Sequence, residues 1–251
     1  MQYRHEDKTI ISEREVVTVR RRLQDLMQRD PHSDENGGYW IRSLYFENVH
    51  TSTFFDKIEG ISDREKYRLR IYNFQGDVLL ERKEKKGSYI RKESVILTEA
   101  ELQAIYDNDS RTLITSEKQL IRRFEISRRL QLLKPVQLVD YYREAFTNPL
   151  GNVRITLDRM LKAPLTLGSL TDRGLPSMDA LPENQSILEI KYDSFIPKHL
   201  GAVVRLDGRQ RQAASKFVIC CATSQKIKEN YTLLTGLILF GTFFPPDLTT
   251  T

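Results

Sequence analysis

Cysteine, histidine and tryptophan are scarce in this chain of 251 residues, which has two, four and one of them respectively. The two cysteines, Cys220 and Cys221, are sequence neighbours, and adjacent positions on a helix give poor disulfide geometry. No disulfide framework and no CxxC pattern are present, which indicates a reducing compartment. The histidines form neither an HExxH motif nor an i, i+4 pair, which argues against a histidine-ligated zinc site.

Long apolar runs are also missing. The most apolar stretch, from Tyr231 to Phe244, is shorter than the ~20 residues of a membrane-spanning helix. The N-terminal stretch is polar and charged, so no signal peptide is expected and a cytoplasmic location is favoured. No repeat or low-complexity linker divides the chain, and we expect a domain over residues 1–225 followed by an apolar tail over residues 226–251.

That tail has three open interpretations. It could pack on the domain or form an oligomer contact, bind a membrane surface, or contact a membrane-protein partner. Lys226 and Lys228 suit a membrane surface, and membrane association would then act through this segment. Neither its role nor the oligomeric state follows from the sequence.

Charge of one sign is not in large excess. Lysine and arginine number 39 and aspartate and glutamate 34, which leaves a formal net charge of +5 and a pI near 9.1. Apolar residues make up 39% and charged residues 29%, a composition typical of a soluble globular chain and not of a disordered one. The balance permits an anionic partner without requiring one.

The periodicity predicts mostly strands with a few helices. Two capping boxes, Ser12 with Glu15 and Thr98 with Glu101, predict helices that run to about residues 28 and 106. Further helices are expected over residues 118–133 and 209–222, with a short helical turn over 52–57. Strands are expected over 3–11, 39–46, 65–73, 77–85 (after a turn at Gly76), 89–97, 136–145, 153–161 and 187–195, and loops over 29–38 and 163–183.

Several predicted strands carry charge on alternate positions. Lys66, Arg68 and Arg70 share one face of their strand, while apolar side chains occupy the other. The same pattern places on one face Glu6 with Lys8, Glu81 with Lys83, Tyr141 with Arg143, Arg154 with Asp158, and Glu189 with Lys191. A single such strand would suggest a solvated sheet face. Six of them favour a closed barrel whose lumen is charged and whose apolar outside is covered by helices.

A basic lumen of this kind suits a polyanion. Arginine matches phosphate oxygens with two parallel hydrogen bonds. Glu189, with Glu6 or Glu81 as further candidates, would be a minority acid among cations. Carboxylates in a phosphate site are natural ligands for Mg²⁺ or Mn²⁺.

Eight segments, taken in order, resemble one known family. They are residues 3–8, 43–48, 66–72, 80–83, 140–145, 153–158, 188–193 and 215–217. These segments are similar to the VTC domain, the polyphosphate polymerase domain of the vacuolar transporter chaperone complex, in its bacterial stand-alone form. That family belongs to the triphosphate tunnel metalloenzymes, which are relatives of the CYTH proteins. The resemblance extends from about Tyr3 to Cys221.

The resemblance implies an α+β fold, an antiparallel β-barrel tunnel with flanking helices. It implies transfer of the γ-phosphoryl group of ATP to a growing polyphosphate chain, with Mn²⁺ or Mg²⁺ as cofactor and pyrophosphate or a short polyphosphate as a primer. Glu189 matches the metal-binding glutamate, and Lys216 the lysine near the reacting phosphate; Lys57 matches a basic position only weakly. Phosphate-binding positions are Lys8, Arg68, Arg70, Lys83, Lys92, Arg143, Arg154, Lys191 and Lys216, of which Arg68, Arg70, Arg154 and Lys216 are expected to act in catalysis.

Other interpretations remain open at this point. The first strand has Arg4 where the hydrolytic members have the first glutamate of ExExK, which favours the polymerase branch. A triphosphate hydrolase (tripolyphosphatase) of the same fold and a non-catalytic polyphosphate-binding module are the alternatives; a specific nucleic-acid partner is not expected. Arg143 could instead pair with Glu144 or Asp140, and the Lys216 side chain could reach the surface.

Overall fold

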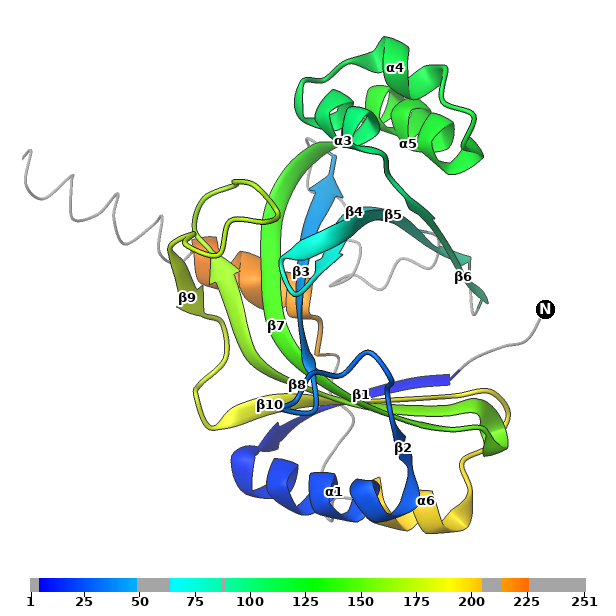
Figure 1. Ribbon diagram of the computed structural model, residues 1–251, viewed down its shortest axis with the longest axis vertical. Coiled ribbons are helices and arrows are strands. Elements are labelled where there is room, and N and C mark those ends of the chain that lie inside the picture. The colour runs from blue at the N-terminus through cyan, green and yellow to red at the C-terminus, as the bar shows by residue number, and fades with distance from the viewer. Residues whose placement is uncertain (1–4, 49–63, 87–88, 205–213, 226–251) are drawn as a thin grey trace, which may run out of the picture.

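The computed structural model describes residues 5–48, 64–86, 89–204 and 214–225. Within them, antiparallel strands form one sheet in the order β1-β10-β8-β7-β3-β4-β5-β6, with β2 paired to β7 and β9 to β8 (Figure 1). The strands are β1 (His5–Ser12), β2 (Gln28–Arg29), β3 (Tyr39–Glu47), β4 (Arg64–Tyr72), β5 (Gln75–Lys86), β6 (Tyr89–Ile96), β7 (Lys134–Asn148), β8 (Val153–Pro164), β9 (Ser177–Asp179) and β10 (Gln185–Tyr192). This confirms the predicted fold class of antiparallel strands with flanking helices. Among the described residues β1 and β6, at the two ends of this order, do not pair, so the sheet is curled and not the closed barrel expected from the sequence.

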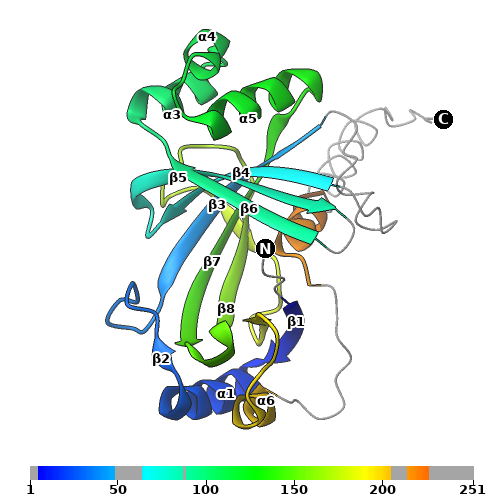
Figure 2. The same ribbon diagram turned by 90° about the vertical axis from the view of Figure 1, so that its right-hand side faces the viewer.

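Helices α1 and α3 to α6 lie in two groups on the outside of the curled sheet (Figures 1 and 2). One group holds α1 (Glu13–Leu26) and α6 (Lys198–Val204), and the other holds α3 (Glu99–Tyr106), α4 (Ser110–Ile114) and α5 (Gln119–Leu130). A 3₁₀ turn, η1 (Leu150–Asn152), precedes β8, and residues 216–225 form a last helix. No helix within these described ranges is long and apolar enough to cross a membrane.

Both capping boxes are confirmed. Ser12 accepts a hydrogen bond from the backbone N–H of Glu15, whose carboxylate accepts from the N–H of Ser12, and α1 begins there. Thr98 and Glu101 do the same at the start of α3. These reciprocal bonds satisfy two of the donors that a helix start leaves free.

Apolar side chains on alternate strand positions fix which face of the sheet each helical group covers. Leu157 and Leu188 lie in one buried cluster with Val16 and Leu23 of α1. Leu69 and Leu80 lie in another with Phe124 of α5. Because strand side chains alternate between faces, the charged neighbours of these residues project to the opposite side. We call that side the inner face.

Several predicted bounds are wrong. Residues 163–183 were expected to be a loop but include the end of β8 and all of β9, and the helix expected over 209–222 begins at residue 216, after two non-helical residues. The turn expected at Gly76 is instead a two-residue hairpin loop of Asn73 and Phe74, both at positive φ. The turn expected over residues 52–57 and the apolar tail expected over residues 226–251 lie outside the described residues, as do Arg4 and Lys57.

Candidate functional site

One group of inner-face residues surrounds Glu81 of β5. The Glu81 carboxylate lies 2.6 Å from Arg68 Nε, 3.5 Å from Arg70 Nη1 and 2.5 Å from Lys92 Nζ. Arg68 also donates to the Tyr45 hydroxyl, and Arg70 to Ser43 Oγ. Strands β4, β5 and β6 supply the four charged residues, and we call them the Glu81 cluster.

The charges of this cluster reinforce one another. Burial raises the pKa of Glu81, but Arg68, Arg70 and Lys92 lower it far more, so the group stays ionised. Burial lowers the pKa of Arg68, but Tyr45 and Glu81 raise it well above its ordinary value. Glu81 and Arg68 therefore both stay ionised at neutral pH.

A second group surrounds Glu189 of β10. Its carboxylate lies 2.5 Å from Lys191 Nζ and 3.5 Å from both Arg143 Nη2 and Lys216 Nζ. Burial raises the pKa of Glu189, but Lys216, Lys8 and Lys191 lower it well below its ordinary value. Arg143 thus contacts Glu189, and not Glu144 or Asp140, the partners that the sequence left open.

Glu6 of β1 lies beside this second group. We call the part of the inner face formed by β1, β10, β8 and β7 one wall of the site, and the part formed by β4, β5 and β6 the other wall. Glu6 contacts Lys8 at 2.8 Å and Lys191 at 3.8 Å, and its carboxylate is within hydrogen-bond reach of Glu189. Burial and Glu189 raise the pKa of Glu6, but Lys8 and Lys83 lower it below its ordinary value overall. Two acidic side chains thus stand together among lysines.

Asp158 of β8 is the residue that the sequence analysis most clearly missed. It accepts from Arg143 Nε at 2.6 Å and Nη2 at 2.8 Å, and Lys216 Nζ lies 2.5 Å away. Its side chain is 1% exposed. The alternation had already placed Asp158 on the charged face, but only the register of β7 and β8, which sets it opposite Arg143, shows what it contacts. Lys216 therefore points inward, as expected, and not to the surface.

Arg154 has a different environment from the other predicted residues. Its Nη2 lies 2.6 Å from Asp30 Oδ2 and 3.0 Å from the Tyr39 hydroxyl. Asp30 follows β2 and was expected only to be part of a loop. Arg154 is thus on the predicted strand, but it contacts a residue that the sequence did not suggest.

Lys83 joins the two walls. It lies on β5, yet its Nζ contacts Glu6 Oε2 of β1 at 3.1 Å, although these strands do not pair. The Lys83 side chain is 44% exposed. This ion pair spans the space between the two ends of the strand order.

The inner face carries more negative charge than the sequence suggested. The nine predicted cations meet five carboxylates, Glu6, Asp30, Glu81, Asp158 and Glu189, which leaves 9 − 5 = +4. The sequence had suggested Glu6, Glu81 and Glu189 as acids of the site, and the structure adds Asp30 and Asp158. Most of the formal charge of +5 nevertheless corresponds to this one set of residues.

These acids bear on whether a divalent ion fits. No group of three or more metal-ligating side chains occurs among the described residues. Glu6 and Glu189 offer a pair of adjacent carboxylates, and Mg²⁺ commonly binds to one or two carboxylates plus water and substrate phosphates. The residues present thus fit an ion that takes its remaining ligands from a phosphate substrate.

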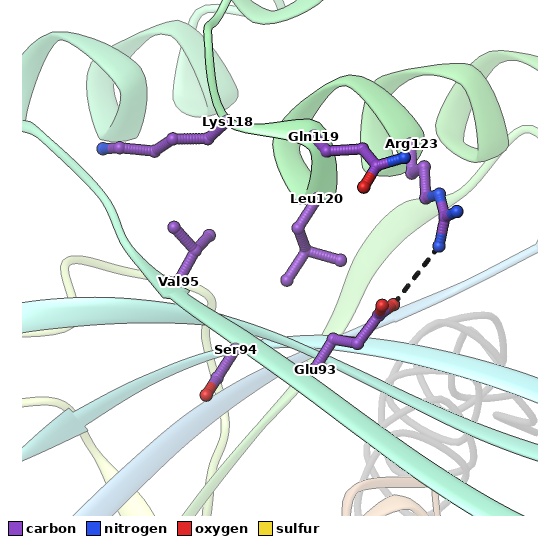
Figure 3. Close-up of a pocket in the computed structure, with 7 residues that line it drawn as sticks. All are labelled: Glu93, Ser94, Val95, Lys118, Gln119, Leu120 and Arg123. Atoms are coloured by element: carbon purple, nitrogen blue, oxygen red, sulfur yellow. Dashed lines mark hydrogen bonds and ion pairs between the residues drawn. The ribbon is translucent and has the colours of Figure 1, made fainter.

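A separate cavity of about 320 Å³ lies between β6 and α5 (Figure 3). It is lined by Glu93, Ser94, Val95, Lys118, Gln119, Leu120 and Arg123. Arg123 and Glu93 form an ion pair of 3.5 Å there. None of the predicted site residues lines it, so the cavity plays no part in the candidate site.

The curled antiparallel sheet, with helices outside it and a cation-rich inner face, defines an α+β protein whose inner face suits an anionic ligand. The model of the VTC domain family matches residues 3–225, and the chain belongs to that family. No curated protein matches the chain in sequence.

Three solved structures illustrate the likeness in fold. PH1819 of Pyrococcus horikoshii OT3 is 16% identical, with a TM-score of 0.43, covering 88% of this chain and 99% of its own. A candidate adenylate cyclase of Bacillus halodurans is 14% identical, with a TM-score of 0.45 and coverages of 99% and 95%. HpAC1 of Hippeastrum, described as having a dominant triphosphatase activity, is 12% identical, with a TM-score of 0.49 and coverages of 89% and 96%.

Proposed function

We propose that this protein is a metal-dependent polyphosphate polymerase that transfers the γ-phosphoryl group of ATP to a growing polyphosphate chain. The observation that carries the proposal is the convergence of Arg68, Arg70, Lys92, Arg143 and Lys216 on one inner face. Membership of the VTC domain family supports it. Phosphoryl transfer depends mainly on positioning and charge neutralisation, which such a set of cations provides.

In the proposed reaction, a terminal phosphate oxygen of the acceptor chain attacks the γ-phosphorus of ATP. One P–O bond forms to the chain, the bond to the β-phosphate oxygen breaks, and ADP leaves. The nucleophile belongs to the acceptor, so the protein needs no serine, cysteine or histidine for this step. Its residues bind and orient two polyanions that would otherwise repel each other.

Each wall has its own part in this proposal. Arg68, Arg70 and Lys92 bind phosphate oxygens on one side, while Arg143 and Lys216 stabilise charge at the reacting phosphate on the other. Asp158 holds the last two in place through its contacts of 2.5–2.8 Å. Lys8, Lys83, Lys191 and Arg154 complete the predicted phosphate-binding set, and Arg154 of this set pairs with Asp30.

Glu189, with Glu6 beside it, would hold the Mn²⁺ or Mg²⁺ ion. When bound, such an ion neutralises charge on the transferring phosphates as a Lewis acid. The two carboxylates keep their charge because the surrounding lysines lower their pKa values against the effect of burial. They are thus available as ligands at neutral pH.

The test is incubation of the purified protein with ATP and Mn²⁺, followed by gel electrophoresis of the products. We expect long polyphosphate chains and ADP. Orthophosphate without polymer would instead identify a hydrolase. Tight polyphosphate binding that survives Glu189→Ala, without turnover, would identify a binding module.

Strand β6 offers a matched pair of variants for this assay. Lys92 contacts Glu81 on the inner face, while its neighbour Arg91 contacts Glu93 at 2.7 Å on the opposite face. The exposed fractions of the two side chains are 50% and 51%. Lys92→Gln should reduce polymer formation and Arg91→Gln should not. Equal effects would contradict the proposed role of Lys92 in binding phosphate.

A further inference from the structure

Glu81 occupies the centre of the cations that the proposed function assigns to phosphate. One of its oxygens, Oε2, faces Arg68 at 2.6 Å and Arg70 at 3.5 Å, and the other, Oε1, faces Lys92 at 2.5 Å. The side chain is 4% exposed. Both oxygens are therefore used by the three cations, inside the site and not at its edge.

A carboxylate and a phosphate accept hydrogen bonds from the same kinds of donors. Each uses anionic oxygens that accept short, charge-assisted hydrogen bonds from guanidinium and ammonium groups. Arg68 already gives Nη1 to Tyr45, and Arg70 gives Nε to Ser43. The N–H groups directed at Glu81 are thus among those that a phosphate would need. An incoming ligand must either displace the carboxylate or share its donors.

We infer that Glu81 is a built-in competitor for the oligophosphate ligand. In the absence of ligand it keeps Arg68, Arg70 and Lys92 assembled as a counter-charge. When an oligophosphate binds, it takes over those donors. The negative charge of Glu81 then repels the bound oligophosphate and weakens its binding. The residue thereby limits affinity and promotes release of the anion. This inference rests on the proposed function only in assigning these cations to phosphate.

Strand β5 supplies the control. Glu84 lies on the same strand but on the opposite face, where it contacts Arg82 Nη1 at 3.1 Å. Arg82 also contacts Glu65 and Glu93 there. Glu84→Gln therefore removes the same charge from the same strand without touching the inner face.

The experiment is calorimetric titration of the metal-free protein with inorganic tripolyphosphate, in buffer containing a chelator and no nucleotide. We expect Glu81→Gln to bind about tenfold more tightly than the wild type, because a like charge that repels the anion is gone. Glu84→Gln should bind like the wild type. Glu81→Asp, which keeps the charge, should also stay close to it.

The opposite hypothesis, that Glu81 only positions the three cations, gives a different pattern. It predicts weaker binding for Glu81→Gln, and that result, or unchanged binding, would overturn the inference. If Glu81→Gln unfolds without ligand, tripolyphosphate should restore its fold, since the ligand replaces the lost counter-charge; failure to refold would likewise contradict it. The titration measures binding and not polymer formation. Its result therefore does not depend on whether the protein forms polymer in the assay of the proposed function.

Discussion

Asp158 shows how one buried carboxylate can direct two cations. It binds Arg143 through both oxygens and holds Lys216, which comes from the helix at residues 216–225. Burial lowers the pKa of Lys216, but Asp158 and Glu189 raise it above its ordinary value. Lys216 thus remains a cation although its side chain is only 10% exposed. Asp158 is a positioning residue in the proposed reaction.

Asp158→Asn should therefore lower turnover far more than it changes KM for ATP. A displacement of about 1 Å in a catalytic group can cost about 100-fold in rate, and we expect a loss of that order. Asp158→Glu keeps the charge and should recover part of the activity. Steady-state kinetics of polymer formation tests this, and wild-type kcat in Asp158→Asn would contradict it.

Arg42 and Asp140 form a comparable pair on the outer side of the sheet. Arg42 Nε and Nη2 donate to the two carboxylate oxygens at 2.8 and 2.7 Å, and both side chains are buried. Arg42 Nη1 donates to the carbonyl of Ser169 and also to that of Asp172. The pair therefore ties β3 and β7 to the chain that follows β8.

Asp140→Ala should destabilise the fold by about 3 kcal/mol, since removing one partner of a buried ion pair leaves the other uncompensated. Urea denaturation measures the change. The double variant Arg42→Met with Asp140→Leu should be less destabilised, and tripolyphosphate affinity should stay unchanged in both. A loss below the error of the measurement would show that the carbonyls alone satisfy Arg42.

At the scale of single residues, the sequence predicted which face of a strand each side chain occupies but not which side chains it contacts. Alternation placed Arg68, Arg70, Lys83 and Glu189 correctly on one face, because side chains alternate in any strand. Which acid meets which cation depends on register, and a shift of one residue would send every side chain to the other face. Glu81 and Asp158 could thus be placed but not paired, and Asp30 lies in a loop, where no periodicity applies.

At the scale of elements, the start of α1 depends on Ser12. Its backbone N–H donates to Glu15 Oε2 at 2.7 Å, and its hydroxyl accepts from the Glu15 N–H at 3.4 Å. Ser12 is also the last residue of β1, so the cap fixes the angle between that strand and the helix. Because α1 covers the outer side of β1, β8 and β10, this local bond supports one wall of the site.

Ser12→Ala should lower the free energy of unfolding by about 1 kcal/mol, the usual cost of losing a side-chain cap. Thr18→Ala is the matched control, since the Thr18 hydroxyl donates only to the carbonyl of Arg14 within the same helix. Such back-bonding adds little to stability. Thermal unfolding of both variants tests the difference, and equal midpoints would contradict the role of the cap.

Elements with a clear local signal were predicted, and short ones were not. The capping boxes predicted α1 and α3. The sequence also predicted eight strands within a few residues of their observed bounds. β2, β9 and α6 have two, three and seven residues, too few for a period of two or 3.6 to give a clear signal. They form because β7, β8 and α1 offer partners, which is tertiary information.

At the scale of the whole molecule, the paired carboxylates make stability depend on pH. In the folded state the pKa values of Glu81, Glu189 and Asp158 are lowered, because neighbouring cations outweigh burial. Such groups stabilise the fold at pH values above their unfolded pKa, and the contribution is lost as pH falls towards the folded value. Asp140, whose pKa burial raises, acts in the opposite direction.

We therefore expect the urea midpoint to be steady near neutral pH and to fall as pH drops below about 4.5, the ordinary value for glutamate. Glu81→Gln should show a shallower fall, since one of the groups that must take up a proton on unfolding is gone. Urea titrations at several pH values measure both. A midpoint that stays constant down to pH 3 would contradict the prediction.

The pairing of β1 with β10 also has a consequence for synthesis of the chain. His5 lies opposite Tyr192 in this register, so the first strand must wait for nearly the whole sheet to be made. At about 5–20 residues per second, a ribosome needs roughly 10–40 s to add that length. During this time Ile11, which is fully buried in the folded protein, has no strand partner from β10. The inner face can thus be completed only late in translation, after both of its walls have emerged.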